Sequence, residues 1–417
     1  MHLINHEKLQ FLSEQAEHLT KEQHNHIEAI ALQNQARVMN SFKKHQVSDF
    51  HFTPSTGYGY DDAGRETLEK IYADVFGAEA ALVRPQIISG THAIATALFG
   101  ILRPSDELLY ITGNPYDTLE EIVGIRGNGK GSLKDFNIGY QAIPLLPEGK
   151  VDLEAVAKAI GPNTKMIGIQ RSCGYADRPS FTIQAIEDLI KEIRKLKEDV
   201  VIFVDNCYGE FVEELEPCHV GADIMAGSLI KNPGGGIVKT GGYLVGKSEY
   251  IELSSYRLAA PGIGAEGGAS LYSLLEMYQG FFLAPHVVSQ AVKGAVFTAA
   301  LLELAGHRST PSYRDKRTDL IQSVHFNDAK SMISFCQAIQ AASPINAHVT
   351  PQPGFMPGYS DDVIMAAGTF IQGASIELTA DGPIRPPYTA YVQGGLTYEH
   401  VKIAVMQALD TILLDNI

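Results

Sequence analysis

The 417-residue sequence has few of the features that mark secreted, metal-binding or nucleic-acid-binding proteins. Its four cysteines, Cys173, Cys207, Cys218 and Cys336, lack the spacing of metal ligands, so we expect buried free thiols. A net charge of −15 opposes contact with a nucleic-acid backbone, although a small pocket could still hold one phosphate. The first eight residues contain no basic segment followed by an apolar run, so we predict no secretory signal and expect a cytoplasmic protein.

Long apolar runs are also few, and we identify no stretch with the length needed to cross a bilayer. Apolar residues make up 45% of the chain and charged residues 19%, which is ordinary for a packed globular protein. Because the chain is longer than one hydrophobic core usually serves, we expect a large domain and a smaller one. No internal repeat and no low-complexity tract is evident.

Three regions are predicted from the order of the patterns. Residues 1–55 are polar with apolar residues at helical spacing, which predicts an N-terminal helical arm. Residues 56–295 form the large domain, and the mostly apolar stretch 267–305 predicts helices that leave it. Residues 296–417 form a small α+β domain in which the proline-rich segments 350–357 and 382–387 are loops.

Strands and helices alternate in the large domain. This order predicts an α/β fold with a mostly parallel sheet covered on both faces, whose ligands bind beyond the carboxyl ends of the strands. The predicted strands are 80–83, 107–111, 166–169, 200–204 and 242–245, and the predicted helices lie near 90–102, 117–126 and 182–197.

A carboxylate and a lysine are predicted to meet at that edge of the sheet. The apolar run Val200–Val204 has the character of a buried parallel strand and ends in Asp205. Twenty-six residues further on, Lys231 precedes the glycine-rich segment 232–236, where the backbone can approach a ligand closely. A lysine can bind an aldehyde cofactor covalently, and a carboxylate opposite a pyridine ring keeps its nitrogen protonated. Lys231 and Asp205 therefore indicate a pyridoxal 5′-phosphate (PLP) site, with Lys231 as the Schiff-base lysine.

Two segments nearer the N-terminus could complete such a site. Ser89, Gly90 and Thr91 precede an apolar helical stretch, and the first turn of a helix offers free backbone N–H groups to an anion. Tyr116 follows a predicted strand, so its ring could stack on a planar cofactor at the same edge.

Each of these residues also has a commonplace interpretation. Asp205 alone could be a turn or cap residue, and the Ser89 segment could be an ordinary helix cap. A lone lysine before a glycine-rich loop is usually solvated, and a lone tyrosine is more often part of the core. The motifs support one another through their order in the chain.

Taken in order, the segments 89–91, Tyr116, 204–206 and 228–231 resemble the fold-type I PLP-dependent enzymes, and most closely the cystathionine β-lyase/methionine γ-lyase group. The segments 57–62, 169–172 and 382–388 are similar to those of the branch known as aluminium resistance proteins. The resemblance covers nearly the whole chain.

The resemblance implies a role for each residue of the site. Ser89, Gly90 and Thr91, together with Ser228, would hold the cofactor phosphate, Tyr116 would stack on the ring, and Asp205 and Lys231 keep the roles given above. Tyr58 or Tyr60 would reach the phosphate of a neighbouring subunit, so a homodimer or homotetramer is implied.

The sequence departs from the family pattern in two places. The relatives' Glu-Thr-Pro-x-Asn-Pro segment is replaced by residues 170–175, with Arg178 beyond it. The segment that supplies a carboxylate-binding arginine in the relatives is here 391–395, which contains none. Arg385 is the best substitute, because a guanidinium can bind a carboxylate through two parallel hydrogen bonds; its alternative is an ordinary loop arginine.

The reaction implied is carbon–sulfur lysis of an amino acid by β- or γ-elimination, giving a 2-oxo acid, ammonia and a thiol. Lys231 would remove the α-proton, and Tyr116 would protonate the leaving group. An aminotransferase on the same scaffold and a non-catalytic PLP-binding protein linked to metal tolerance stay open. A serine acyl enzyme is a further alternative, because Ser228-x-x-Lys231 and Lys239-Thr240-Gly241 match two fragments of penicillin-binding proteins. The sequence contains no evident carboxylate cluster that would indicate a metal site.

Overall fold

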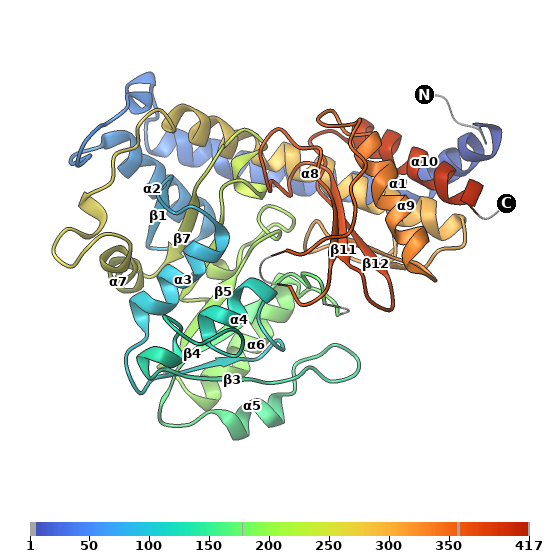
Figure 1. Ribbon diagram of the computed structural model, residues 1–417. Helices are drawn as coiled ribbons and strands as arrows, with labels where there is room; N and C mark the ends of the chain where they lie inside the picture. The colour runs from blue at the N-terminus through green and yellow to red at the C-terminus, as the bar shows by residue number, and fades with distance from the viewer. Residues whose placement is uncertain (1–5, 177, 357–358, 416–417) are drawn as a thin grey trace.

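The computed structural model describes residues 6–176, 178–356 and 359–415, which form two sheets connected by long helices (Figure 1). The larger sheet has seven strands in the order β1-β7-β6-β5-β4-β2-β3. Its bounds are β1 Ala80–Arg84, β2 Glu107–Tyr110, β3 Gly139–Ala142, β4 Thr164–Gln170, β5 Val201–Asp205, β6 Ile224–Ser228 and β7 Gly242–Gly246. The pairs from β3 to β6 are parallel, whereas β7 is antiparallel to both β6 and β1.

Helices cover both faces of this sheet, as the alternation of the sequence predicts. Along β5, Val201 and Phe203 pack in the cluster of α3 Gly90–Ile101, α4 Asp117–Val123 and α7 Ser248–Leu258. Ile202 and Val204 point the other way, into the cluster of α2 Ala63–Phe76, α5 Leu153–Ala159 and α6 Ile183–Leu196. Because successive strand residues face opposite sides, a strand buried on both faces is apolar throughout.

Two long helices run along one side of the molecule (Figure 1). The predicted N-terminal arm is one helix, α1 His6–Lys44, and it packs along α8 Leu274–Leu304. The expectation of several helices in 267–305 was wrong, since α8 is continuous. Our expectation that no stretch is long and apolar enough to cross a membrane was also wrong, because α8 meets that criterion by length and composition. However, 78% of its most apolar window is buried inside the protein, which is the pattern of a core helix.

The C-terminal part is a smaller α+β unit. Five antiparallel strands follow the order β10-β11-β12-β9-β8. Their bounds are β8 Ser309–Thr310, β9 Gln322–His325, β10 Val363–Ala366, β11 Thr379–Pro383 and β12 Thr389–Gln393, with helices α9 Ala329–Ala341 and α10 Tyr398–Asp415. The prediction that 382–387 is a loop was wrong for its first two residues. Gly382 and Pro383 form the end of β11 and pair with Ile364 and Val363 of β10. Of the predicted loop 350–357, residue 357 lies outside the described residues.

The fold class is confirmed: a mostly parallel sheet is followed by a smaller α+β unit. All five predicted strands and all three predicted helices of the large domain occur, with ends that differ by a few residues. The predicted boundary between residues 295 and 296 falls inside α8, which packs against both η4 Asn232–Gly234 of the first part and α10 of the second. The four cysteines are free thiols, and Cys173, Cys207 and Cys336 are buried as expected. The expectation was wrong for Cys218, which is half-buried.

Candidate active site

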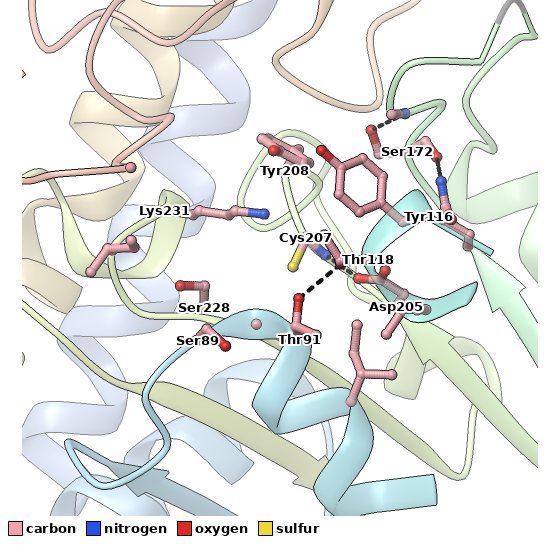
Figure 2. A pocket seen from close by; sticks show the side chains of 17 residues that line it. Ser89, Thr91, Tyr116, Thr118, Ser172, Asp205, Cys207, Tyr208, Ser228 and Lys231 are labelled. Atoms are coloured by element: carbon pink, nitrogen blue, oxygen red, sulfur yellow. Dashed lines mark hydrogen bonds between the residues drawn. The ribbon is translucent and has the colours of Figure 1, made fainter. Parts of the chain in front are cut away.

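A cavity of about 200 Å³ lies at the carboxyl ends of the parallel strands (Figure 2). Seven of the predicted site residues line it, namely Ser89, Gly90, Thr91, Tyr116, Asp205, Ser228 and Lys231. They come from the start of α3, the segment before α4, the ends of β5 and β6, and the turn after β6. Parallel strands bring segments that are distant in sequence to one edge, and this is why residues up to 142 positions apart share one cavity.

The start of α3 forms one wall. Ser89 caps the helix, since its Oγ accepts a hydrogen bond from the backbone N–H of His92 at 3.0 Å. Thr91 Oγ1 lies 3.0 Å from Thr118 Oγ1 of α4. A side chain at Gly90 would place its Cβ 3.1 Å from Cys207 Sγ, so glycine allows the helix to approach the floor of the cavity closely. The first backbone N–H groups of a 12-residue helix therefore lie at the cavity.

Ser228 lies beside this wall at the end of β6. Its side chain is buried, and its Oγ has no hydrogen-bond partner among the described residues. Burying a hydroxyl without a partner is costly, so this oxygen indicates a polar ligand group at this point. An unpartnered hydroxyl beside a helix N-terminus fits a phosphate, as the PLP prediction requires.

Asp205 ends β5 on another side of the cavity (Figure 2). One of its oxygens accepts a hydrogen bond from the backbone N–H of Cys207 at 3.1 Å. Burial raises the pKa of Asp205, while the positive charge of Lys231 acts in the opposite direction. A cationic ring nitrogen at this carboxylate would favour its ionised form.

Lys231 extends into the cavity with its amine over the ring of Tyr208 (Figure 2). The Lys231 Nζ atom lies 3.9 Å from the centroid of that ring. Burial acts to lower the pKa of Lys231, but Cys207, Tyr208 and Asp205 outweigh it, so the pKa is raised. The free amine is therefore held as an ammonium until a ligand changes its surroundings.

Tyr116 closes another wall. Its hydroxyl lies 2.6 Å from the hydroxyl of Tyr359, which belongs to the C-terminal part. A side chain at Gly174, where φ is +59°, would come within 2.9 Å of the Tyr116 ring. Burial raises the pKa of Tyr116 well above its ordinary value, so its hydroxyl keeps its proton at neutral pH.

A buried carboxylate stands behind this aromatic wall. Asp381 Oδ1 accepts hydrogen bonds from Tyr175 OH at 2.6 Å and from Gln393 Nε2 at 3.1 Å. Gln393 belongs to the segment that supplies an arginine in the relatives. Burial raises the pKa of Asp381 to about 6. Where the relatives have an arginine, this chain therefore has the neutral amide of Gln393, which is hydrogen-bonded to Asp381.

Three predicted residues lie apart from the cavity. Arg385 is exposed and forms an ion pair with Asp361, with Nη1 2.9 Å from Oδ2. Tyr58 and Tyr60 stack on each other with ring centroids 5.4 Å apart and line a different hollow. Both tyrosines are exposed, at 78% and 52%. Their predicted contact with a neighbouring subunit stays a prediction.

Sequence reasoning did not assign several residues that line the cavity. They are Ile94, Thr118, Leu119, Gln170, Ser172, Gly174, Cys207, Tyr208, Ile230 and Gly373. Cys207 and Tyr208 could have been found, since they directly follow the Asp205-Asn206 pair at the strand end. Gly373 carries no such signal, because it reaches the cavity from the C-terminal part by tertiary packing alone.

The structure gives no support to a serine acyl enzyme that would use Ser228, Lys231 and Lys239 together. Lys239 is exposed and pairs with Glu276, so it lies outside the cavity that holds Ser228 and Lys231. Among the described residues, no group of three His, Cys, Asp or Glu side chains could hold a metal ion.

The comparisons with known proteins agree with this geometry. The family model for methionine γ-lyase matches residues 9–413. The uncharacterised protein YnbB of Bacillus subtilis is 72% identical over 391 residues, which cover 94% of this chain and 93% of YnbB. Two solved structures superpose closely. One is a candidate cystathionine β-lyase involved in aluminium resistance from Listeria monocytogenes, with 66% identity, a TM-score of 0.95 and coverage of 97% of this chain and 100% of that one.

The other is a carbon–sulfur lyase involved in aluminium resistance from Clostridium novyi, with 47% identity, a TM-score of 0.93 and coverage of 97% and 96%. A PLP-dependent Escherichia coli protein, YhfS, is only 17% identical, with a TM-score of 0.60 and coverage of 91% and 96%. The similarity to YhfS concerns the fold alone.

Proposed function

Since the chain belongs to the methionine γ-lyase family, we propose that it is a PLP-dependent carbon–sulfur lyase that acts on a sulfur-containing amino acid. Its reaction would release a thiol, a 2-oxo acid and ammonia. One observation carries the proposal: a single cavity contains the Lys231 amine, the Asp205 carboxylate and the unpartnered Ser228 hydroxyl beside the start of α3. The relatives named as carbon–sulfur and cystathionine β-lyases support the same reaction class.

The chain's own residues would divide the binding of PLP between them. Ser89, Gly90, Thr91 and Ser228 would hold the phosphate, and the positive end of the α3 dipole would favour its charge. Asp205 would face the ring nitrogen and keep it protonated. Lys231 would anchor the cofactor aldehyde, and Tyr116 would stack on the ring.

When bound, PLP supplies an electron sink that makes the α-carbon of an amino acid acidic. Lys231 would accept the α-proton, because its amine is the basic group that reaches into the cavity. Tyr116 would donate a proton to the departing sulfur, since burial keeps its hydroxyl protonated. The space left by Gly174 accommodates the Tyr116 ring, and the Tyr359 hydroxyl orients the Tyr116 hydroxyl for this proton transfer.

We also propose that two copies of the chain share each site, with Tyr58 or Tyr60 reaching the phosphate bound by the neighbouring subunit. The exposure of both tyrosines supports this proposal, because large exposed aromatic side chains are typical of interfaces.

The first experiment is a visible absorption spectrum of the purified protein after incubation with PLP, compared with a Lys231→Ala variant. We expect a visible absorption band of lysine-bound PLP that borohydride removes and that the variant lacks. Absence of the band from the wild type would refute the PLP assignment.

A product assay then separates elimination from its alternative, transamination. With cystathionine, cysteine or methionine as substrate, we expect stoichiometric ammonia, 2-oxo acid and thiol. Amino transfer to an added 2-oxo acid without release of ammonia would instead make the protein an aminotransferase. Comparison of the 2-oxo acids formed would distinguish β- from γ-elimination.

A further inference from the structure

Tyr208 combines an unusual backbone with a specific contact. Its φ is +73°, a left-handed conformation that a bulky residue rarely adopts. The turn around it is fixed by backbone hydrogen bonds from Asn206 N–H to Ala226 at 3.1 Å and from Gly209 N–H to Asn206 at 3.0 Å. Non-glycine residues in this conformation concentrate at functional sites, where the surrounding structure maintains the strain.

This backbone conformation places the Tyr208 ring at the cavity, next to the Lys231 amine. Tyr208 lines the cavity, and Lys231 Nζ lies 3.9 Å from its ring centroid, well within the range of a cation–π contact (Figure 2). We propose that Tyr208 is a positioning residue, whose ring face holds the free ammonium of Lys231 over the cavity. This inference rests on the proposed function, because it concerns the lysine that would bind PLP.

The surroundings of Lys231 make such a contact effective. Lys231 and Tyr208 are both half-buried, and a cation–π contact gains strength as water is removed from around it. The other ionisable groups that face this amine are Asp205, Cys207 and Glu210, besides Tyr208 itself. Of these, the Tyr208 ring is the group that the structure places directly against the amine.

The contact would assist the proposed proton transfer. When the Cα–H bond of a substrate breaks, its electron pair stays with the carbon and the proton goes to the lone pair of Lys231 Nζ. Lys231 then carries a full positive charge, which the ring face stabilises. In the protein without PLP, the same contact favours the ammonium, so the addition of PLP should require a higher pH.

The test compares the cofactor-free wild type with Tyr208→Asn and Tyr208→Phe. Asparagine tolerates positive φ but removes the ring, whereas phenylalanine keeps the ring and removes the hydroxyl. The rate of PLP addition is followed across pH by the borohydride-sensitive band. We expect the pH midpoint to fall by roughly one unit in Tyr208→Asn and to stay near the wild-type value in Tyr208→Phe.

A shape-matched variant covers the case in which Tyr208→Asn fails to fold. Pentafluorophenylalanine at position 208 keeps the ring but reverses its surface charge, so it should lower the midpoint as Tyr208→Asn does. Equal midpoints in wild type and the ring-altered variants would overturn the proposal, as would a Tyr208→Phe protein that behaves like Tyr208→Asn. A wild type without any band would overturn the proposed function itself, and this inference with it.

Discussion

The hydroxyl of Tyr116 lies 2.6 Å from that of Tyr359 and so links the cavity wall to the C-terminal part of the protein. The same short segment of the C-terminal part contains Asp361, which is paired with Arg385. One segment therefore engages both the tyrosine predicted to protonate the leaving group and the arginine predicted to bind the substrate carboxylate.

Loss of the Tyr359 hydroxyl should weaken the reaction but not the binding of the cofactor. In Tyr359→Phe, Tyr116 loses the partner that fixes its hydroxyl, so we expect kcat to fall about tenfold or more. The visible band of bound PLP should be unchanged, because Tyr359 lies outside the lining of the cavity. Tyr256→Phe is a suitable control, since Tyr256 is a half-buried residue of α7 outside the cavity and its hydroxyl bonds to Glu252. A wild-type kcat for Tyr359→Phe would contradict the role given to this contact.

The layers of the large domain could be predicted because each carries a local pattern. The run Val200–Val204 is apolar on both faces of the strand, and this identified β5 directly. The strands β3 and β6 were missed for opposite reasons. β3 lies at the edge of the sheet and contains no buried residue, while β6 includes Gly227, where a Cβ would approach a side-chain oxygen of Glu210 within 2.6 Å. Such packing constraints appear only in the folded structure.

Ser228→Ala should weaken PLP binding without weakening the fold. The Ser228 hydroxyl has no partner among the described residues, so its removal sacrifices no described hydrogen bond. A hydrogen bond to a charged phosphate contributes about 1.5–3 kcal/mol, which corresponds to a rise in the Kd for PLP of roughly 10- to 150-fold. A matched control is Ser289→Ala, because Ser289 is also buried but bonds to the carbonyl of His286 in α8. A PLP titration should show a loss of affinity in the first variant and little change in the second.

Arg385 and Asp361 should have opposite effects on substrate binding. If Arg385 binds the substrate carboxylate, Arg385→Ala should raise KM about tenfold or more. Asp361→Asn should lower KM, because it removes the anion that competes for Arg385. Steady-state kinetics with one amino-acid substrate checks both changes. An unchanged KM in both variants would show that Arg385 is a loop arginine and that other groups bind the carboxylate.

Glu210 makes stability depend on pH in a defined direction. Burial raises its pKa to about 8, whereas the pKa in an unfolded chain is about 4.3. Between these values the folded state keeps a proton that the unfolded chain releases, so the free energy of unfolding falls as pH rises. The loss is on the order of 3–5 kcal/mol and is complete above about pH 8.

Glu210→Gln removes this dependence while keeping an acceptor for Tyr243 OH, which lies 2.6 Å from Oε1. We expect its Tm to exceed that of the wild type at pH 8 and the difference to disappear near pH 4.5. Calorimetry of the cofactor-free proteins across this range measures both. A constant difference in Tm would mean that Glu210 does not titrate in this window.

The centre of the candidate site could be predicted, whereas its periphery could not. Asp205 ends a strand that was predicted, so chain topology determined its neighbourhood. Lys231 was found through the glycine-rich segment that follows it, because the strand before it was missed. Arg385 was selected for its chemistry, and its position depends on how the loop after β11 packs, which the sequence does not reveal. Tyr359 and Asp381 were missed because they belong to the C-terminal part, whose contact with the cavity is purely tertiary.

If two subunits share each site, two inactive variants should restore each other's activity in a mixed dimer. The Tyr58→Ala,Tyr60→Ala double variant and the Lys231→Ala variant should each be nearly inactive when expressed alone. In a mixed dimer, the chain that retains Lys231 receives intact tyrosines from its partner, so one of the two sites is complete. Equal co-expression should then restore about a quarter of the wild-type activity, because half of the dimers are mixed and each has one working site. The activity of the unfractionated co-expressed protein measures this recovery, and mixed dimers isolated through two affinity tags should reach about half of the wild-type activity. If the tyrosines acted within their own chain, both sites of the mixed dimer would be defective and no activity would return.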